Sequence, residues 1–430
     1  MVAKRSSEAV QLTTDDEPAA PGMIMDATRL AAVCDTIDDY FKRGAPMNRR
    51  QVAAVCAMID GRAVSRRDRR MRRRNCVDST RRYEQQTCPI GSGTYGVVAK
   101  ASHRGTGRTV AVKTFPAPHA GEEEEPSDVT DVLREACFLA ACRGHQNLVG
   151  FHGVARDPAT GDYSLVMEYV GPSLRSALTD RLEKNNRRAF PEAAVRGVMR
   201  QLLAGAEAMH ARRVIHCDIK PGNALVGDGG IGDGVVKICD LGLAMSTAET
   251  RPPYGSVGTA RYMAPEVLTD MPEYDERVDT WSLGCVMVEL LSGEALFKAD
   301  YYIDRMFDVL DAPAVETWET FMPPLMGGEV LRRQAARPRP PCPRGRLREL
   351  FPCETLSQDG FDVLRGLLAC NPKERLTAAA ALRLPWFTTD TGDSTILGDR
   401  ASPFVRVLNS VWTLVRQIAL PLIVSCPGIA

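Results

Sequence analysis

The stretch HCDIKPGN, residues 216–223, holds polar groups of types that can bind a phosphate and a metal ion. The Asp218 carboxylate could accept a proton from an alcohol, and the Lys220 ammonium could neutralise a phosphoryl oxygen. The Asn223 amide could ligate a divalent cation. Further along, KICDLGLA places Asp240 at the end of an apolar strand, before a glycine that permits a sharp turn. A carboxylate at such a turn can bridge metal ions.

A glycine-rich segment, IGSGTYGVV, lies between two runs that are typical of strands. Its glycines are Gly91, Gly93 and Gly96. Glycine lets a backbone approach phosphate oxygens closely and offer N–H donors to them. No helix follows the glycines, which argues against a Rossmann dinucleotide site. Taken alone, the pattern fits a plain β-hairpin as well as a phosphate-binding loop.

Lys113 lies in the apolar strand pattern TVAVKTF, downstream of the glycines. A lysine inside an apolar strand is costly unless an anionic group faces it. Glu135, in the helical pattern LREACFL, is a candidate partner. A lysine on the solvent face of an alternating strand would give the same sequence, so both interpretations stay open at this point.

The elements that must position these groups fall into two halves. Short β-branched runs separated by polar turns extend to about residue 170, and one helical pattern interrupts them. From residue 171 the chain is mostly helical, apart from a glycine-rich section with strands at 213–243. A β-rich half followed by an α-rich half predicts an α+β fold of two packed lobes with a cleft between them.

Composition is that of an ordinary globular protein and argues against several function classes. The 430 residues suffice for two domains with a large core. Lys+Arg and Asp+Glu are equal at 54 each, so no global charge favours nucleic acid or a membrane surface. The N-terminal residues show no apolar core of signal-peptide length. The 13 cysteines have no regular spacing and predict free thiols in a reducing compartment, hence the nucleus or the cytoplasm.

Residues 1–82 are expected to form an N-terminal extension. Residues 1–22 have the composition of a disordered segment. Residues 23–60 predict two short amphipathic helices, which carry the similar sequences AAVCDTID and AAVCAMID. An arginine-rich run between Arg62 and Arg74 is typical of a solvated charged segment, and a nuclear-import signal or an anionic docking patch is the alternative.

Two more segments stand outside the main pattern. Residues 333–349 are rich in proline and arginine and are interpreted as an insert or loop. The tail, residues 389–430, contains the apolar run VLNSVWTLVRQIALPLIVS, which Arg416, Gln417 and Pro421 interrupt. A helix that docks on the body or lies on a surface is therefore favoured over a membrane anchor.

Taken in order, these motifs resemble the signature set of the protein-kinase family. APE at residues 264–266, DTWSLG at 279–284 and NPKERLTA complete the set, and Arg375 in the last motif is expected to pair with Glu266. The resemblance covers residues 83–388. It implies a bilobal protein-kinase fold with a small lobe at 83–167, a hinge at 168–171 and a large lobe at 172–388.

Within this family, several stretches are similar to the cyclin-dependent kinases. They are IGSGTYGVVAKA, ALFKADYYIDRMFDVLDAP and LTAAAALRLPWF. The cysteine-bearing HCDIKPGN is most similar to the divergent plant F-type members.

The resemblance implies a serine/threonine protein kinase that uses ATP and Mg²⁺. Asp218 would be the catalytic base, and Lys220 would contact the γ-phosphate. Asn223 and Asp240 would hold Mg²⁺. Lys113, ion-paired to Glu135, would hold the α- and β-phosphates. The other cofactor-binding residues that the resemblance implies are Ile90, Gly91, Gly93, Gly96, Val98, Ala111, Glu168, Val170 and Leu225.

Two departures from the family pattern concern partners. The helix motif that cyclins grip is VTDVLRE here, residues 129–135, and it keeps only the final Arg-Glu. A cyclin-like or other activator is a candidate partner of this family, but the sequence of this motif argues against it. Met263 replaces the arginine that helps favour proline after the target residue, so proline-directed specificity is not expected.

Two other departures concern control by phosphorylation. Tyr254 occupies the position of the family's activating threonine, and Cys217 replaces the arginine that would bind its phosphate. A cysteine cannot make the bidentate contact of a guanidinium. The pattern predicts an activation loop that is ordered without that phosphate, with Ser256 and Thr259 as weaker phosphorylation candidates.

Three alternatives to an active cyclin-dependent kinase-like enzyme remain open from the sequence. A catalytically weak pseudokinase scaffold that acts through the N-terminal region is one alternative, and a cyclin-independent kinase of another group is a second. A nucleic-acid-binding protein is the third, but no aromatic-basic interleaving supports it. Lys113, Asp218, Asn223 and Asp240 are all present, which favours the enzyme. The expected partner is a protein substrate, without specific nucleic acid or stable membrane insertion.

Overall fold

The structure is a computed structural model, and it describes part of the 430-residue chain. The described residues are 27–42, 49–59, 77–93, 96–115, 129–247, 258–268, 274–297, 306, 309–310 and 346–388. The arginine-rich run, Tyr254, Ser256, residues 333–345 and the apolar tail lie outside these residues, and so the predictions made for them stay predictions. Residues 347–349, interpreted from the sequence as the end of an insert or loop, instead form the start of a helix.

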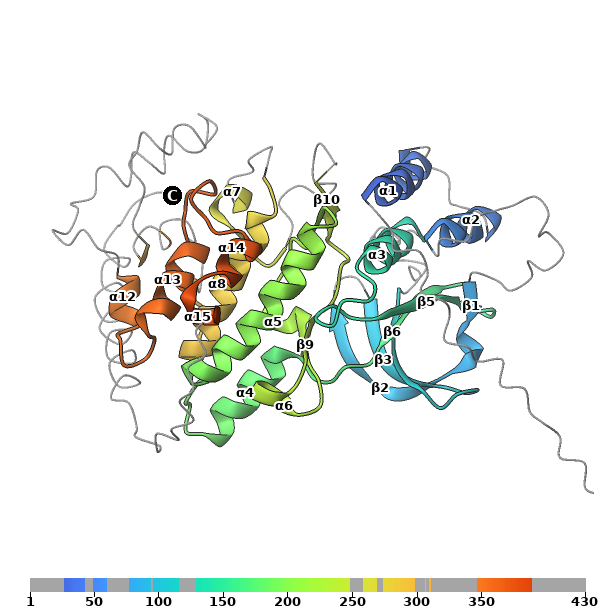
Figure 1. The fold of residues 1–430 in the computed structure, drawn as a ribbon. Coiled ribbons are helices and arrows are strands. Elements are labelled where there is room, and N and C mark those ends of the chain that lie inside the picture. The colour runs from blue at the N-terminus through green and yellow to red at the C-terminus, as the bar shows by residue number, and fades with distance from the viewer. Residues whose placement is uncertain are drawn as a thin grey trace, which may run out of the picture.

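A six-stranded sheet forms the smaller of two lobes (Figure 1). Its spatial order is β1-β5-β6-β4-β3-β2, and every neighbouring pair is antiparallel except β1 with β5. The central strand β4 buries four consecutive residues, which means that it is covered on both faces of the sheet. The strands are β1 (Val77–Ser79), β2 (Tyr83–Gly93), β3 (Gly96–His103), β4 (Thr109–Thr114), β5 (Phe151–Arg156) and β6 (Tyr163–Glu168).

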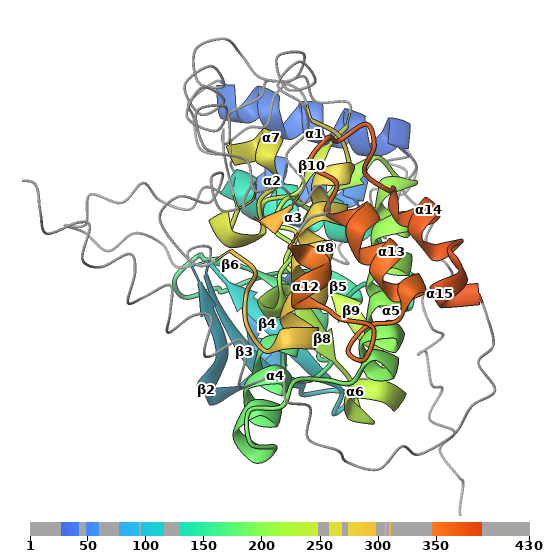
Figure 2. The same cartoon turned by 90° about the vertical axis from the view of Figure 1, so that its left-hand side faces the viewer.

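Three helices lie on one side of this sheet. Figures 1 and 2 show α3 (Val129–Ala141) between the sheet and the two N-terminal helices, α1 (Ala27–Lys42) and α2 (Arg49–Ile59). Both N-terminal helices contact α3. The two short helices predicted within residues 23–60 are thus confirmed.

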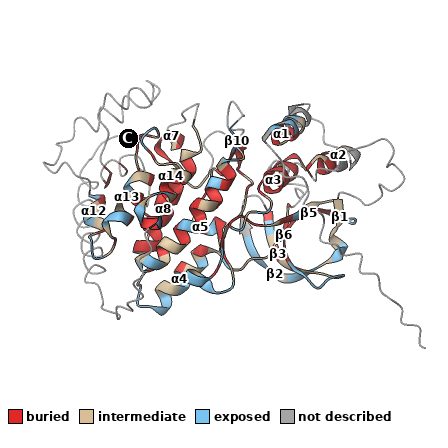
Figure 3. Cartoon of the chain, viewed as in Figure 1, coloured by how far each residue is buried: buried red, intermediate tan, exposed pale blue. Residues whose placement is uncertain are grey.

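The larger lobe is mostly helical and is built around α5 (Glu192–His210) and α8 (Arg277–Ser292). Nearly every residue of α8 is buried, including the charged Asp279 and Glu289, whereas α4 exposes one face (Figure 3). Short strands at the lobe boundary carry the candidate catalytic loops. The other elements of this lobe are α4 (Leu174–Lys184), β7 (Val214–Ile215), η3 (Pro221–Asn223), β8 (Ala224–Val226), α6 (Gly230–Asp233), β9 (Val236–Ile238), β10 (Met245–Ser246), η4 (Ala260–Tyr262), α7 (Pro265–Leu268), α12 (Leu347–Leu350), α13 (Gln358–Leu367), α14 (Ala378–Leu382) and α15 (Pro385–Thr388).

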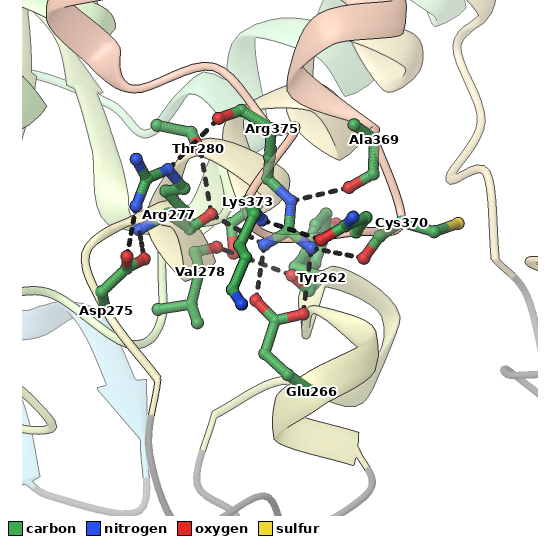
Figure 4. A network of polar contacts seen from close by, with 12 residues as sticks. Tyr262, Glu266, Asp275, Arg277, Val278, Thr280, Ala369, Cys370, Lys373 and Arg375 are labelled. Atoms are coloured by element: carbon green, nitrogen blue, oxygen red, sulfur yellow. Dashed lines mark hydrogen bonds and ion pairs between the residues drawn. The ribbon is translucent and has the colours of Figure 1, made fainter. Parts of the chain in front are cut away.

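A buried arginine ties the C-terminal helices to α7 (Figure 4). The Arg375 guanidinium donates to both Glu266 oxygens, at 2.5 and 2.9 Å. It also donates to the backbone carbonyls of Ala369, Arg277 and Cys370. All five of its N–H groups thus have an acceptor, which is the condition under which a buried guanidinium is stable. The predicted Arg375–Glu266 pair is confirmed.

Helices long and apolar enough to cross a membrane are absent from the part of the chain that the structure describes.

Candidate active site

The first of two polar clusters joins three elements of the chain around Lys113, on β4. Its ammonium donates to Glu135 of α3 at 2.8 and 3.1 Å. It also donates to Asp240, in the loop after β9, at 2.7 Å. Lys113 and Glu135 are buried, whereas the Asp240 side chain is 38% exposed. The structure thus excludes the solvent-facing interpretation of this lysine.

The electrostatics of this cluster follow from two carboxylates that share one ammonium. Burial alone would lower the pKa of Lys113, but the charges of Glu135 and Asp240 outweigh it and hold this pKa above its ordinary value. Burial raises the pKa of Glu135 to about 7 against the opposing pull of Lys113. The pKa of Asp240 is lowered, because Lys113 outweighs the desolvation of this carboxylate. Asp240 is therefore the carboxylate that stays ionised, as a metal ligand must be.

The second cluster surrounds the Asp218 carboxylate, in the loop after β7. One of its oxygens accepts from the Lys220 ammonium at 2.6 Å and from the Asn223 amide at 3.2 Å. The other accepts from the Thr259 backbone N–H at 2.9 Å and from the Thr259 hydroxyl at 2.8 Å. The Lys220 ammonium also donates to this hydroxyl at 2.9 Å. Both oxygens are thus held in place, and Thr259 brings the segment before α7 to the cluster.

A buried aspartate of α8 sets the backbone beneath this loop. Asp279 accepts from the backbone N–H groups of His216 and Cys217, at 2.9 and 3.0 Å. The His210 ring also hydrogen-bonds to this carboxylate, at 2.9 Å. Cys217 has a φ of +66°, which is uncommon for a residue with a side chain. The contacts to Asp279 therefore stabilise a strained backbone turn, and this turn sets the position of Asp218, the next residue.

Cys217 itself lines a small, largely apolar pocket. Its thiol lies 3.9 Å from the backbone oxygen of Ile215. Gly258, with a φ of +118°, lies close to the Cys217 backbone, since a Cβ at this position would lie only 2.7 Å from the Cys217 oxygen. The pocket is lined by Cys217, Met263, Ala264, Val267, Tyr274, Val278 and Ser282.

The residues predicted to hold a nucleotide lie on strands and loops of both lobes. Gly96 begins β3 with a φ of +131°, and a Cβ there would lie 2.5 Å from the Thr114 oxygen, so only glycine fits. Leu225 of β8 forms an isolated bridge with Ser173, which brings this strand to the segment after β6. The others lie on β2 (Ile90, Gly91, Gly93), on β3 (Val98), on β4 (Ala111) and at or just after the end of β6 (Glu168, Val170).

Sequence reasoning missed one polar network near this site. Glu289 of α8 accepts from the Tyr262 hydroxyl at 2.7 Å, and Arg175 of α4 donates to both. Each residue stands in a different element, and no short motif joins them. Glu289 interrupts the apolar run at residues 285–291 of α8, and a charged residue within such a run was the one signal in the sequence that it had a buried partner.

The class of protein follows from a comparison with family models. The model described as the protein kinase domain matches residues 84–387. This range includes both polar clusters and both lobes. The chain therefore belongs to the protein kinase family, whose members use ATP and phosphorylate proteins.

Among curated proteins, several similar relatives are cyclin-dependent kinases. The chain is 46% identical over 311 residues to "Putative cyclin-dependent kinase F-2" of Oryza sativa subsp. japonica, covering 70% of this chain and 88% of that protein. It is 34% identical over 314 residues to cyclin-dependent kinase G1 of Arabidopsis thaliana, covering 70% of this chain and 48% of that one. Cyclin-dependent kinase 11.2 of Caenorhabditis elegans is 32% identical over 309 residues, with 70% and 44% covered. The chain is thus a serine/threonine protein kinase of the cyclin-dependent kinase-like type.

Proposed function

We propose that this chain transfers the γ-phosphate of ATP to serine or threonine hydroxyls of protein substrates with Asp218 as the base. The observation that carries the proposal is the Asp218 cluster. Four donors from Lys220, Asn223 and Thr259 fix both carboxylate oxygens. Positioning of this kind, with charge stabilisation, accounts for most of the catalysis in phosphoryl transfer.

In this proposal Asp218 orients and deprotonates the incoming hydroxyl. The Thr259 hydroxyl already donates to Asp218 at 2.8 Å, so a hydroxyl fits beside this carboxylate. Lys220 lies 2.6 Å from the same carboxylate and can neutralise charge that develops on the transferred group. A proton acceptor and a cation therefore lie side by side at the point of transfer.

Asn223 and Asp240 would hold Mg²⁺, which neutralises charge on the ATP phosphates when it is bound. Their carboxylate and amide oxygens are the hard donors that this ion prefers. The Asn223 amide nitrogen is engaged by Asp218, at 3.0 Å from its backbone oxygen, which leaves the amide oxygen for a ligand. Asp240 shares Lys113 with Glu135, so this cluster has one negative charge in excess when both are ionised. A divalent cation would offset that charge.

The nucleotide would lie between the strands of the small lobe and β8. Lys113 would contact the α- and β-phosphates while its ion pair with Glu135 orients it. Ile90, Val98 and Ala111 would cover one face of the adenine, and Leu225 the other. The backbone of Glu168 and Val170 would hydrogen-bond its edge. The backbone near Gly91, Gly93 and Gly96 would approach the phosphates.

We further propose that activity does not require a phosphate on the activation loop. Cys217 offers no guanidinium for such a phosphate, and its pocket is largely apolar. The segment at 258–268 is instead fastened by the contacts of Thr259 with Asp218 and Lys220. In this proposal these contacts hold the segment before α7 in place, as a phosphate on the activation loop does in other kinases.

A transfer assay with a peptide library tests the proposed reaction. We expect the full chain with Mg²⁺ and ATP to phosphorylate serine or threonine peptides, and Asp218→Asn to lose at least a hundredfold of that rate. Asp228→Asn, at an exposed position after β8, is the matched control and should keep the wild-type rate. Equal rates in Asp218→Asn and wild type would overturn the assignment. No transfer by either protein would favour the pseudokinase scaffold.

Phosphatase treatment tests the proposal that activity does not require a phosphate on the activation loop. Protein treated to remove all phosphate, as verified by peptide mass mapping, should keep its rate of peptide phosphorylation within about threefold. The reason is that Cys217 cannot bind a loop phosphate as a guanidinium would. Complete loss of activity after dephosphorylation would show that a loop phosphate is needed.

A further inference from the structure

The α1–α2 hairpin covers the side of α3 that faces away from the sheet (Figures 1 and 2). Each of its helices buries one stripe at the spacing i, i+3, i+4, i+7, the apolar face of an amphipathic helix. The Arg29 guanidinium of α1 also donates to the Met58 backbone oxygen of α2, which joins the two helices. The stripe residues belong to the same apolar core as α3, and they are Leu30, Val33, Cys34 and Ile37 of α1 and Val52, Val55, Cys56 and Ile59 of α2.

Because of this hairpin, α3 is buried on all sides. Its residues 130–141 are buried, except for one that is half-buried, and consecutive helical residues point in every direction around the axis. The sheet covers one side of α3, and the hairpin covers the opposite side. A helix enclosed in this way cannot tilt or shift without breaking contacts on one of the two sides.

Two residues of α3 show how the hairpin and the active site are related. The Glu135 carboxylate points toward the sheet, where it accepts from the Lys113 ammonium on β4. Cys137 hydrogen-bonds to Cys34 of α1, and this contact together with burial raises the pKa of Cys137. The two positions are two residues apart, roughly 200° around the helix. The face of α3 that touches α1 is thus nearly opposite to the face that reaches Lys113.

We infer that α1 and α2 act as a built-in positioning element, which presses α3 toward the sheet and keeps Glu135 on Lys113. This inference rests on the proposed function, because the Lys113–Glu135 pair matters for phosphate transfer. The hairpin occupies the outer face of α3 within the same chain. A separate activator subunit that bound this face would have to displace the hairpin first, so the isolated chain already holds α3 in place.

Matched aspartate substitutions on neighbouring residues test the inference. Val33→Asp places a charge in the stripe that contacts α3, whereas Ala32→Asp places the same charge on the exposed side of α1. Val55→Asp and Ala54→Asp form the corresponding pair on α2. Hydrogen exchange of α3, with α5 as the internal reference, reports the packing of α3. This measurement is made in the Asp218→Asn background, so it needs no catalysis.

We expect Val33→Asp and Val55→Asp to speed exchange in α3 at least tenfold and to leave α5 unchanged. In the catalytically intact chain, the same variants should raise the KM for ATP and lower kcat, together at least tenfold in kcat/KM. Ala32→Asp and Ala54→Asp should match wild type in all measurements. Val33→Leu, which keeps the side chain apolar, should restore the wild-type KM for ATP.

The outcomes separate this inference from the proposed function. If Val33→Asp frees the hairpin, seen as fast exchange in α1, but α3 exchange and kcat/KM stay at wild-type values, the inference is overturned. If the wild-type chain transfers no phosphate while α3 exchange still responds as expected, the proposed function fails and the positioning role stands. Should Val33→Asp fail to fold, Val33→Ala is measured below its own melting temperature, and α3 exchange equal to that of Ala32→Asp then refutes the inference.

Discussion

Two buried ion pairs, Lys113–Glu135 in the small lobe and Arg375–Glu266 in the large lobe, are satisfied in different ways. The Arg375 guanidinium finds an acceptor for each of its N–H groups, and its one carboxylate partner is bound through both oxygens. It also stacks over the Trp281 ring, with the guanidinium carbon 5.0 Å from the ring centre. Lys113 instead serves two carboxylates, one of which is partly exposed.

This difference indicates that the Arg375–Glu266 pair has a structural role, whereas the Lys113 cluster belongs to the proposed active site. In the large lobe the charges balance, one to one, and the pair holds α7 against the C-terminal helices (Figure 4). In the small lobe the charges do not balance, and the three groups stand on β4, α3 and the loop after β9. The Lys113 cluster joins the small lobe to a loop of the large lobe, so its geometry depends on the position of α3 and of that loop.

The largest expected effect is on catalysis. Lys113→Met should lower kcat/KM for peptide phosphorylation by about 10²–10³-fold, because one preorganised cation is lost. The melting temperature should change little, since Glu135, with a pKa of about 7, can take up a proton when its partner is removed. Steady-state kinetics and a thermal melt measure both. Lys184→Met, at an exposed pair on α4, is the control. A rate within tenfold of wild type would contradict the assigned role.

The large-lobe pair should show the reverse response. Arg375→Met should reduce the free energy of unfolding by about 3–5 kcal/mol, because Glu266 is left buried without its partner. Denaturant unfolding measures this loss. Adding Glu266→Leu should recover part of the stability, since no unpaired charge then remains. A loss below about 1 kcal/mol in the single variant would mean that the two pairs do not differ as described.

Much of this organisation could be predicted from the sequence. The proposed catalytic loop is local, since Asp218, Lys220 and Asn223 lie within six residues and need one turn to meet. The Arg375–Glu266 pair was predicted from the resemblance and is present. The two N-terminal helices were predicted from their apolar spacing. The α+β two-lobed fold also follows from the order of strand and helix patterns.

The remaining features depend on tertiary contacts that no local pattern encodes. An apolar stripe shows that α1 has a buried face, but not that α3 is the surface that covers it. The contact of Lys113 with Asp240 depends on a φ of +66° at Asp240, which the sequence did not indicate. The Arg175–Tyr262–Glu289 network likewise joins three elements that are distant in the chain.

A smaller, pH-dependent effect should distinguish the two pairs further. With its pKa near 7, Glu135 keeps a proton in the folded protein that the unfolded chain releases above about pH 4.5. The folded state therefore binds more protons in this window, and the stability due to this group falls as pH rises from about 4.5 to 7. Relative to Glu135→Gln, wild type should lose on the order of 2 kcal/mol over that range.

Denaturant unfolding at several pH values measures this difference. All the other ionisable groups are present in both proteins, so their contributions cancel in the comparison. A glutamine in place of Glu266 serves as the control, because it changes a buried carboxylate of the large lobe that Arg375 binds through both oxygens. A flat difference between wild type and Glu135→Gln from pH 4.5 to 7 would show that Glu135 is ionised throughout.

The smallest expected effect is at Cys217, beside the catalytic loop. Cys217→Ala should keep kcat/KM within about threefold, less than 0.7 kcal/mol in barrier height, because the turn is held through its backbone N–H. The thiol approaches the Ile215 oxygen only to 3.9 Å. Asp279→Asn removes a carboxylate oxygen that this backbone needs, and it should cost at least tenfold in the same peptide assay. A tenfold loss in Cys217→Ala as well would assign the thiol itself a role in transfer.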